Sequence, residues 1–218
     1  EFVTSLGIKP EIENGSLHEA HAIGAFTGTN PLEMSAAYSA FSNGGYYNEP
    51  YAVSKFTYRD TGNTVEHKSQ KKKAMSESTA FMIASVLQDV QLNGGGKIPN
   101  YAVKTGTTNF EDAYVQKKGL PWDAIRDSWA VGFSTKTTLA MWYGYNESSS
   151  EYCMRNVPSS IEKDKLYRTL VNEVIEKDRE EFRMPDRGVK LPIINGSDPA
   201  KVAPSGYTGG NVIYEYFK

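Results

Sequence analysis

The segment Lys104–Thr108, which reads Lys-Thr-Gly-Thr-Thr, constrains this chain more than any other feature of the sequence. It follows the short apolar run Tyr101–Val103, so the pattern predicts a strand that ends in these residues. Thr105 and Thr107 are two residues apart and therefore face the same side of such a strand. Gly106 has no side chain, which lets a second backbone approach closely. Together with the lysine ammonium, this edge suits the binding of a carboxylate and an acyl carbonyl.

The segments on either side of this motif decide between a binding edge and an ordinary strand end with turn residues. Upstream, residues 28–45 combine Pro-Leu-Glu-Met with a final Asn-Gly-Gly. Downstream, residues 127–145 contain Asp-Ser-Trp and then Trp-Tyr-Gly-Tyr. The order of these segments resembles the transpeptidase domain of class A penicillin-binding proteins, the bifunctional peptidoglycan synthases. The resemblance covers roughly residues 1–185.

The resemblance implies a fold of the α/β (α+β) class, in which helices flank an antiparallel sheet, as in the penicillin-binding and β-lactamase-like transpeptidases. We expect residues 1–185 to form the C-terminal portion of the transpeptidase domain. Residues 186–218 are rich in Pro, Gly and Ser, and we expect them to form a loose C-terminal tail that is pinned to the body in places.

The resemblance also implies a serine-type D-Ala-D-Ala transpeptidase that cross-links peptidoglycan stem peptides through an acyl-serine intermediate and is a target of β-lactams. In the family pattern Lys104 and Thr107 are catalytic: the lysine supports a proton relay, and the Thr107 backbone N–H stabilises the oxyanion. Thr105, Gly106, Thr107 and Thr108 are the implied substrate-binding residues. The hydroxyls of Thr105 and Thr107 hold the substrate carboxylate, Gly106 keeps the groove open, and Thr108 shapes the strand exit.

The nucleophile that this mechanism needs has no credible candidate in the chain. Ser-x-Asn is absent from the sequence, and Ser-x-x-Lys occurs only as Ser69–Lys72, in a charged loop, and as Ser160–Lys163, at a predicted helix start. A nucleophilic serine needs its lysine on the next helical turn in a cleft shielded from water, and neither site has apolar surroundings. We therefore expect the serine to come from a preceding N-terminal segment of the same protein, and this chain alone to be inactive.

Composition limits the partners and the location. The chain has 218 residues and a net charge of −2, so it gives no reason to expect nucleic acid as a partner. No apolar run approaches the ~18 residues of a membrane span, so we expect the membrane anchor to lie outside this chain. The resemblance places the domain at the extracytoplasmic face of the bacterial cell membrane. The expected partners are peptidoglycan stem peptides, β-lactam antibiotics and the preceding segment, without a cofactor.

Two alternatives stay open. One is a DD-carboxypeptidase or serine β-lactamase of the same superfamily, although the Asn-Gly-Gly helix end and the Trp-Tyr-Gly-Tyr strand favour the synthase. The other is a non-catalytic, penicillin-binding-like module that serves as a cell-wall scaffold or sensor, for which an absent serine is the expected sign. The residues that precede Glu1 distinguish them, because a Ser-x-x-Lys there supports the enzyme.

Other candidate sites are weaker. His18 and His21 are three residues apart, whereas the zinc-protease helix needs a spacing of four and a third ligand, so we expect no metal. Cys153 is the only cysteine, which excludes an intrachain disulfide.

The hydrophobic pattern predicts three helices, which begin at the caps Asn30 and Ser76 and near Ser160. The third is expected to run over 160–182, with a charged face that includes Lys163 and Asp164 in solvent. Its expected apolar stripe consists of Leu166, Leu170, Val171, Val174 and Ile175.

Residues 46–58 are expected to form a turn and a strand, with residues 60–63 as a hairpin turn and 64–66 as the return strand. Further strands are expected over 129–133 and 139–145, the second of them central and buried on both faces. Residues 71–73 are expected to be a solvated turn. Residues 109–126 form a segment longer than the family pattern has there, and we expect this insertion to be either a lid beside the groove or a surface loop, with Trp122 packed.

Overall fold

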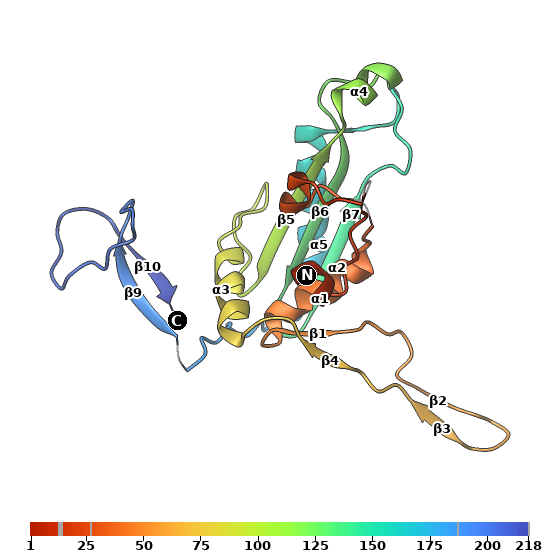
Figure 1. Cartoon of the computed structure of the whole chain (residues 1–218), viewed down its shortest axis with the longest axis horizontal. Coiled ribbons are helices and arrows are strands. Elements are labelled where there is room, and N and C mark those ends of the chain that lie inside the picture. Colours follow the sequence, from red (N-terminus) through yellow and green to blue (C-terminus); the bar gives the residue numbers. More distant parts are fainter. Residues whose placement is uncertain (13–14, 27, 187, 218) are drawn as a thin grey trace.

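A four-stranded antiparallel sheet forms the centre of the computed structural model, which describes residues 1–12, 15–26, 28–186 and 188–217 (Figure 1). The strands follow the order β5 (Ala102–Asn109), β6 (Ala124–Phe133) and β7 (Thr138–Tyr143), and the short β8 (Met154–Arg155) pairs with the start of β6. Within the described residues, β5 pairs only with β6 and is therefore an edge strand. The Lys-Thr-Gly-Thr motif lies on this edge.

Helices cover both faces of the sheet, so the predicted α+β class is confirmed. The helix α5 (Asn156–Val174) packs on one face, in a core that includes Val103 and Ala130. The helices α2 (Pro31–Ser42) and α3 (Glu77–Leu87) pack on the other face, around Ala102 and Phe133. Because successive residues on a strand face opposite sides, β5 contributes to both cores.

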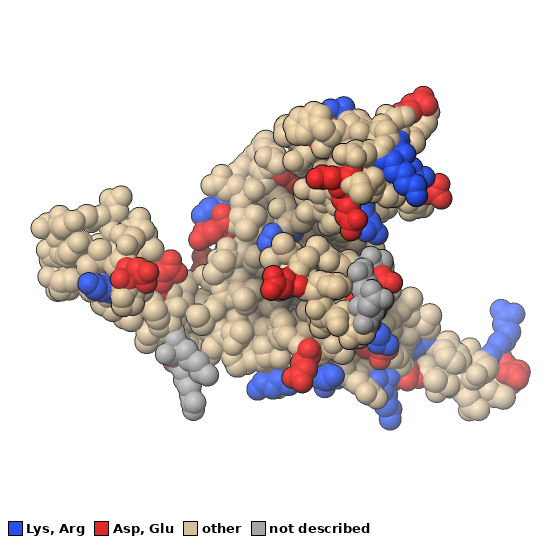
Figure 2. Space-filling model, turned by 45° about the horizontal axis from the view of Figure 1, so that its top comes forward, with Lys and Arg blue, Asp and Glu red and all other residues tan. Residues whose placement is uncertain are grey.

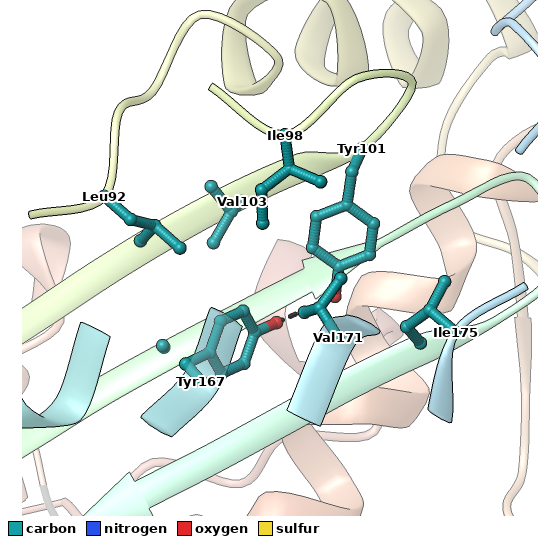
Figure 3. Close-up of a cluster of buried hydrophobic side chains, with 8 residues drawn as sticks. Leu92, Ile98, Tyr101, Val103, Tyr167, Val171 and Ile175 are labelled. Carbon is teal, nitrogen blue, oxygen red and sulfur yellow. Dashed lines mark hydrogen bonds between the residues drawn. The ribbon is translucent and has the colours of Figure 1, made fainter. Parts of the chain in front are cut away.

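A pair of buried tyrosines joins α5 to the sheet (Figure 3). The hydroxyls of Tyr101 and Tyr167 lie 2.9 Å apart, and the Tyr167 hydroxyl also donates to the Leu139 carbonyl oxygen of β7 at 2.8 Å. Burial raises the pKa of both hydroxyls, so both stay protonated and able to donate. Around them pack Leu92, Ile98, Val103, Val171 and Ile175.

The first two helices begin where the sequence predicts. The Asn30 side chain accepts a hydrogen bond from the Glu33 backbone N–H at 3.0 Å, and Pro31 occupies the first helical position. The Ser76 side chain accepts one from the Thr79 backbone N–H at 3.1 Å. These caps satisfy backbone donors that have no partner inside the helix.

The third helix differs from its prediction. It runs over Asn156–Val174 rather than 160–182, and Leu166 and Val174 of the predicted apolar stripe are exposed. The buried residues of the helix are Ser159, Lys163, Asp164, Tyr167 and Val171. All of these except Val171 carry a polar group. The prediction that Lys163 and Asp164 face solvent is wrong, because both lie on the side of the helix that covers the sheet.

One two-stranded arm extends from the body toward the lower right of Figure 1, with one pair of strands at its base and another near its tip. The strand expected over 46–58 is interrupted: β1 (Tyr46–Asn48) pairs with β4 (Lys71–Lys73), and β2 (Lys55–Thr57) pairs with β3 (Thr64–Glu66). The predicted turn at 60–63 is confirmed by the second pair. The prediction of a solvated turn at 71–73 is wrong, since these lysines form strand β4, although all three are exposed.

The strand β7 and the tail also differ from expectation. Every residue of β7 is half-buried and, in the described part of the chain, β7 pairs only with β6, so the prediction of a central strand buried on both faces is wrong. The tail is not loose throughout, because β9 (Val189–Ile194) and β10 (Val212–Phe217) form a hairpin. It contacts α3 through an edge-to-face pair of Phe81 and Tyr216.

The remaining elements are short helices: α1 (Phe2–Ser5), the 3-10 helix η1 (Glu19–Ile23) and α4 (Asp112–Lys118). Among the residues that the structure describes, no helix combines the length and the apolar character needed to cross a bilayer. On the face shown in Figure 2, basic and acidic side chains are interspersed.

We predict that Tyr167→Phe lowers the free energy of unfolding by about 1–3 kcal/mol, because it leaves the half-buried Leu139 carbonyl without its hydroxyl donor and removes the buried Tyr101 contact. Urea denaturation measures the change. The control is Tyr152→Phe, at a side chain that is 58% exposed, which should change stability by less than about 0.5 kcal/mol. Equal effects of the two substitutions would show that the buried pair does not hold α5 to the sheet.

Candidate functional site

A groove of about 980 Å³ runs along the edge that β5 forms. Residues 104–109 of β5 line one side, and residues 23–26 and 28–31, which lead into α2, line the other. Trp129 and Trp142, from the two neighbouring strands, also line the groove. The motif therefore lies beside an open trench and is not enclosed in the core.

The strand register divides the motif between the two faces of β5. Lys104 is opposite Val131 and Gly106 is opposite Trp129, and both of these partners line the groove. Thr105 is opposite Ala130, a residue of the α5 core, so Thr105 and Thr107 share the other face, as their spacing predicts. All of them still line the groove, because an edge strand is open along its side.

The Lys104 side chain is exposed, and its ammonium donates a hydrogen bond to the Thr105 carbonyl oxygen. Further along the strand, the pairing with β6 shifts register between Thr108 and Asn109. The pairing passes over Arg126 of β6, and a bulge of this kind interrupts the regular ladder and increases the local twist.

Gly106 is not required by the packing of the protein itself. A Cβ atom added there would meet only the Trp129 Cβ, at 3.6 Å, which is an ordinary van der Waals contact. At Gly132, on the adjacent strand, an added Cβ would lie 2.6 Å from the Ala102 carbonyl oxygen. The open space above Gly106 therefore belongs to the groove, where a ligand backbone can approach the strand.

An aromatic and acidic cluster lies where the groove passes the exit of β5. The Trp142 indole N–H donates to the Asp127 carboxylate at 2.8 Å, and the Arg126 guanidinium lies 3.6 Å from the other carboxylate oxygen. The Trp142 ring packs closely over Gly144, where an added Cβ would lie 2.5 Å from the ring. This contact gives a physical reason for glycine in the Trp-Tyr-Gly-Tyr segment.

A buried ion pair supports the groove from the opposite face of the sheet. The Lys163 ammonium, whose residue is 2% exposed, donates to the Trp129 carbonyl oxygen at 3.0 Å and lies 3.0 Å from an oxygen of Asp164. Asp164 accepts hydrogen bonds from the backbone and side-chain N–H groups of Asn93, both at 2.8 Å. Sequence reasoning missed this ion pair. The signal that could have found it is the spacing of Lys163, four residues from both Ser159 and Tyr167, which places the three residues on the same side of the helix.

Neither Ser-x-x-Lys sequence lies in the groove. Ser69 is exposed between β3 and β4, at the base of the projecting hairpin. Ser160 donates to the Asn156 carbonyl oxygen at 2.6 Å, and its lysine, Lys163, is committed to Trp129 beneath the sheet. The geometry therefore gives neither serine an activating base facing the groove.

Two other sequence features have clear positions. His18 and His21 stack with ring centroids 5.5 Å apart, and within the described residues no group of three metal-binding side chains includes them. The insertion contains α4, and Trp122 is 89% exposed, so the expectation that this tryptophan packs is wrong.

Comparison with known families matches residues 4–170 to the penicillin binding protein transpeptidase domain. The chain is 34% identical over 225 residues to penicillin-binding protein 1A/1B of Bacillus subtilis, covering 100% of this chain and 24% of the relative. It is 33% identical over 162 residues to penicillin-binding protein 1A of Streptococcus oralis, covering 66% of this chain and 24% of the relative. The chain thus spans about a quarter of the length of these relatives.

Solved structures support the same fold. Penicillin-binding protein 1A from Haemophilus influenzae superposes with a TM-score of 0.59 at 18% identity, over 98% of this chain and 35% of that one. Penicillin-binding protein PonA1 from Mycobacterium tuberculosis superposes with a TM-score of 0.56 at 20% identity, over 84% of this chain and 50% of that one.

We predict that Gly106→Ala leaves the free energy of unfolding unchanged or raises it by up to about 1 kcal/mol, because alanine restricts the unfolded chain and meets no close contact here. The matched control, Gly132→Ala, should lower it by about 1–3 kcal/mol through overpacking. Urea denaturation measures both variants. Similar losses at the two positions would mean that Gly106 serves packing rather than the groove.

Proposed function

Because this chain belongs to the penicillin-binding protein transpeptidase family, we propose that it supplies the Lys-Thr-Gly-Thr side of a D,D-transpeptidase active site in peptidoglycan synthesis. The observation that carries the proposal is the open groove along β5, with Lys104 exposed at its side and unobstructed space above Gly106. A peptide that ends in a carboxylate can extend along such an edge and present its carbonyl to the strand.

In this proposal the donor stem peptide lies in the groove with its terminal carboxylate near the Thr105 and Thr107 hydroxyls. A serine attacks the carbonyl of the penultimate D-alanine, the amide bond breaks, and the terminal D-alanine leaves with a proton on its amine. Lys104 attracts the negative charge and supports the proton relay, while the Thr107 backbone N–H stabilises the oxyanion. β-Lactams acylate the same serine.

The serine comes from a preceding segment of a longer polypeptide, which also carries the membrane anchor at the extracytoplasmic face. The positions of Ser69 and Ser160 outside the groove support this division of the site. The fraction of the relatives' length that this chain spans is consistent with it.

In the complete polypeptide, we predict that Lys104→Ala reduces the rate of acylation by a fluorescent penicillin by about 10²–10³, because one electrostatic contact to the reacting group is lost. Gel fluorescence measures the labelling, and the thermal unfolding temperature should not change. The control Lys118→Ala, at an exposed position of α4 outside the groove, should label normally. Normal labelling of Lys104→Ala would contradict its role.

The 218-residue chain by itself should form no covalent penicillin adduct, because no serine in the groove has an activating base. Intact-mass spectrometry after incubation with penicillin tests this expectation. A penicilloyl adduct on Ser69 or Ser160 would contradict it. A complete polypeptide that also fails to label would favour the non-catalytic cell-wall module instead.

A further inference from the structure

A second cavity of about 950 Å³ continues the groove beyond the exit of β5. The two cavities share part of their lining, including Phe26, Thr108, Asp127 and Trp142, so they form one continuous trench that meets where the pairing of β5 with β6 shifts register after Thr108. Transpeptidation joins two peptides, and a donor that occupies the Lys104 end leaves the far end for a second peptide.

The two ends of the trench differ in charge. Lys104 lines the first cavity and is absent from the lining of the second, whereas Glu111 and the imidazoles of His18 and His21 line only the second. Arg126 and Asp127 line both. The first cavity therefore favours an anionic group, such as a terminal carboxylate, and the second is better suited to a cation.

Asp127 is placed to receive that cation. Its carboxylate accepts one hydrogen bond from the Trp142 indole, and its side chain remains 27% exposed. A carboxylate has about four acceptor positions, so it retains capacity for an ammonium donor. The 3.6 Å approach of the half-exposed Arg126 is a weak ion pair that a ligand can displace.

The second cavity also suits the aliphatic chain that carries an amine. Its lining includes Phe110 and Tyr114, whose rings stack with centroids 5.1 Å apart, and Tyr145 from the far side. Aromatic faces pack against methylene groups and attract a cation close to the ring.

We propose that this second cavity binds the amine-bearing acceptor peptide and that Asp127 positions its ammonium group next to the acylated serine. This inference rests on the proposed function. The ammonium releases one proton to solvent, and the free amine attacks the acyl-serine ester. The new C–N bond forms, the serine C–O bond breaks, and a second amine proton passes to the serine oxygen.

The test uses the complete polypeptide, a peptide that ends in D-Ala-D-Ala as acyl donor and a lysine-containing tripeptide amide as acceptor probe. Asp127→Asn keeps an acceptor oxygen for Trp142 but removes the charge, so the KM for the probe should rise about tenfold, the loss expected for one charge-assisted hydrogen bond. Acylation by fluorescent penicillin, which uses no acceptor peptide, reports on the donor groove that Asp127 also lines, and its rate should fall by a smaller factor than the KM rises. Hydroxylamine, an uncharged acceptor at neutral pH, should react equally with both proteins.

Two further variants sharpen the result. Trp142→Phe keeps an aromatic ring but removes the indole donor that orients Asp127, and it should raise the KM of the probe by a smaller factor. Asp112→Asn removes an exposed carboxylate outside the cavity lining and should leave the KM unchanged.

An unchanged KM in Asp127→Asn, or an equal loss with hydroxylamine, would overturn the proposal. A parallel loss of penicillin labelling would also overturn it, because Asp127 would then act on the donor or on folding. Failure of the wild-type polypeptide to label would instead show that the proposed function is wrong.

Discussion

The hydrogen-bonded pair of Tyr101 and Tyr167 is the interaction on which the rest of the structure depends. It lies between α5 and the sheet, and through the Leu139 carbonyl it connects the segment before β5, the helix and β7. Buried hydroxyls are costly unless they are paired, so this arrangement fixes one position of the helix relative to the strands. With α5 fixed, the opposite face of β6 and the open edge of β5 can serve a ligand.

Along β6 and the start of β5, support comes from the α5 side and binding from the other side, while Thr105 and Thr107 reach the groove at the open edge of β5. The Trp129 side chain lines the groove, while its carbonyl oxygen is held from behind by the buried Lys163 ammonium. On β5, Val103 packs into the α5 core, and Gly106 leaves its side of the strand open to the groove. A rigid strand with one packed face and one open side can hold a peptide backbone in a fixed register, which acyl transfer requires.

The sequence predicted the parts of this site that depend on local chemistry. The motif strand, the caps at Asn30 and Ser76 and the turn at 60–63 are confirmed, because each is set by residues close together in the chain. The buried Lys163–Asp164 pair could not be predicted, since its burial depends on Trp129 and Asn93, which are distant in sequence. The pairing of β4 with β1 likewise depends on a contact between separated segments. Charge indicated solvent in both cases, and tertiary packing buried Lys163 and Asp164, whereas the lysines of β4 stay exposed within a paired strand.

The most direct test of the account is a crystal structure of the complete polypeptide acylated by a β-lactam. The account predicts that the drug lies along β5, with its carboxylate within hydrogen-bonding distance of the Thr105 or Thr107 hydroxyl and its acyl oxygen facing the Thr107 backbone N–H. A drug bound to a serine elsewhere, with residues 104–108 making no contact to it, would contradict the central claim that this edge receives the acyl donor.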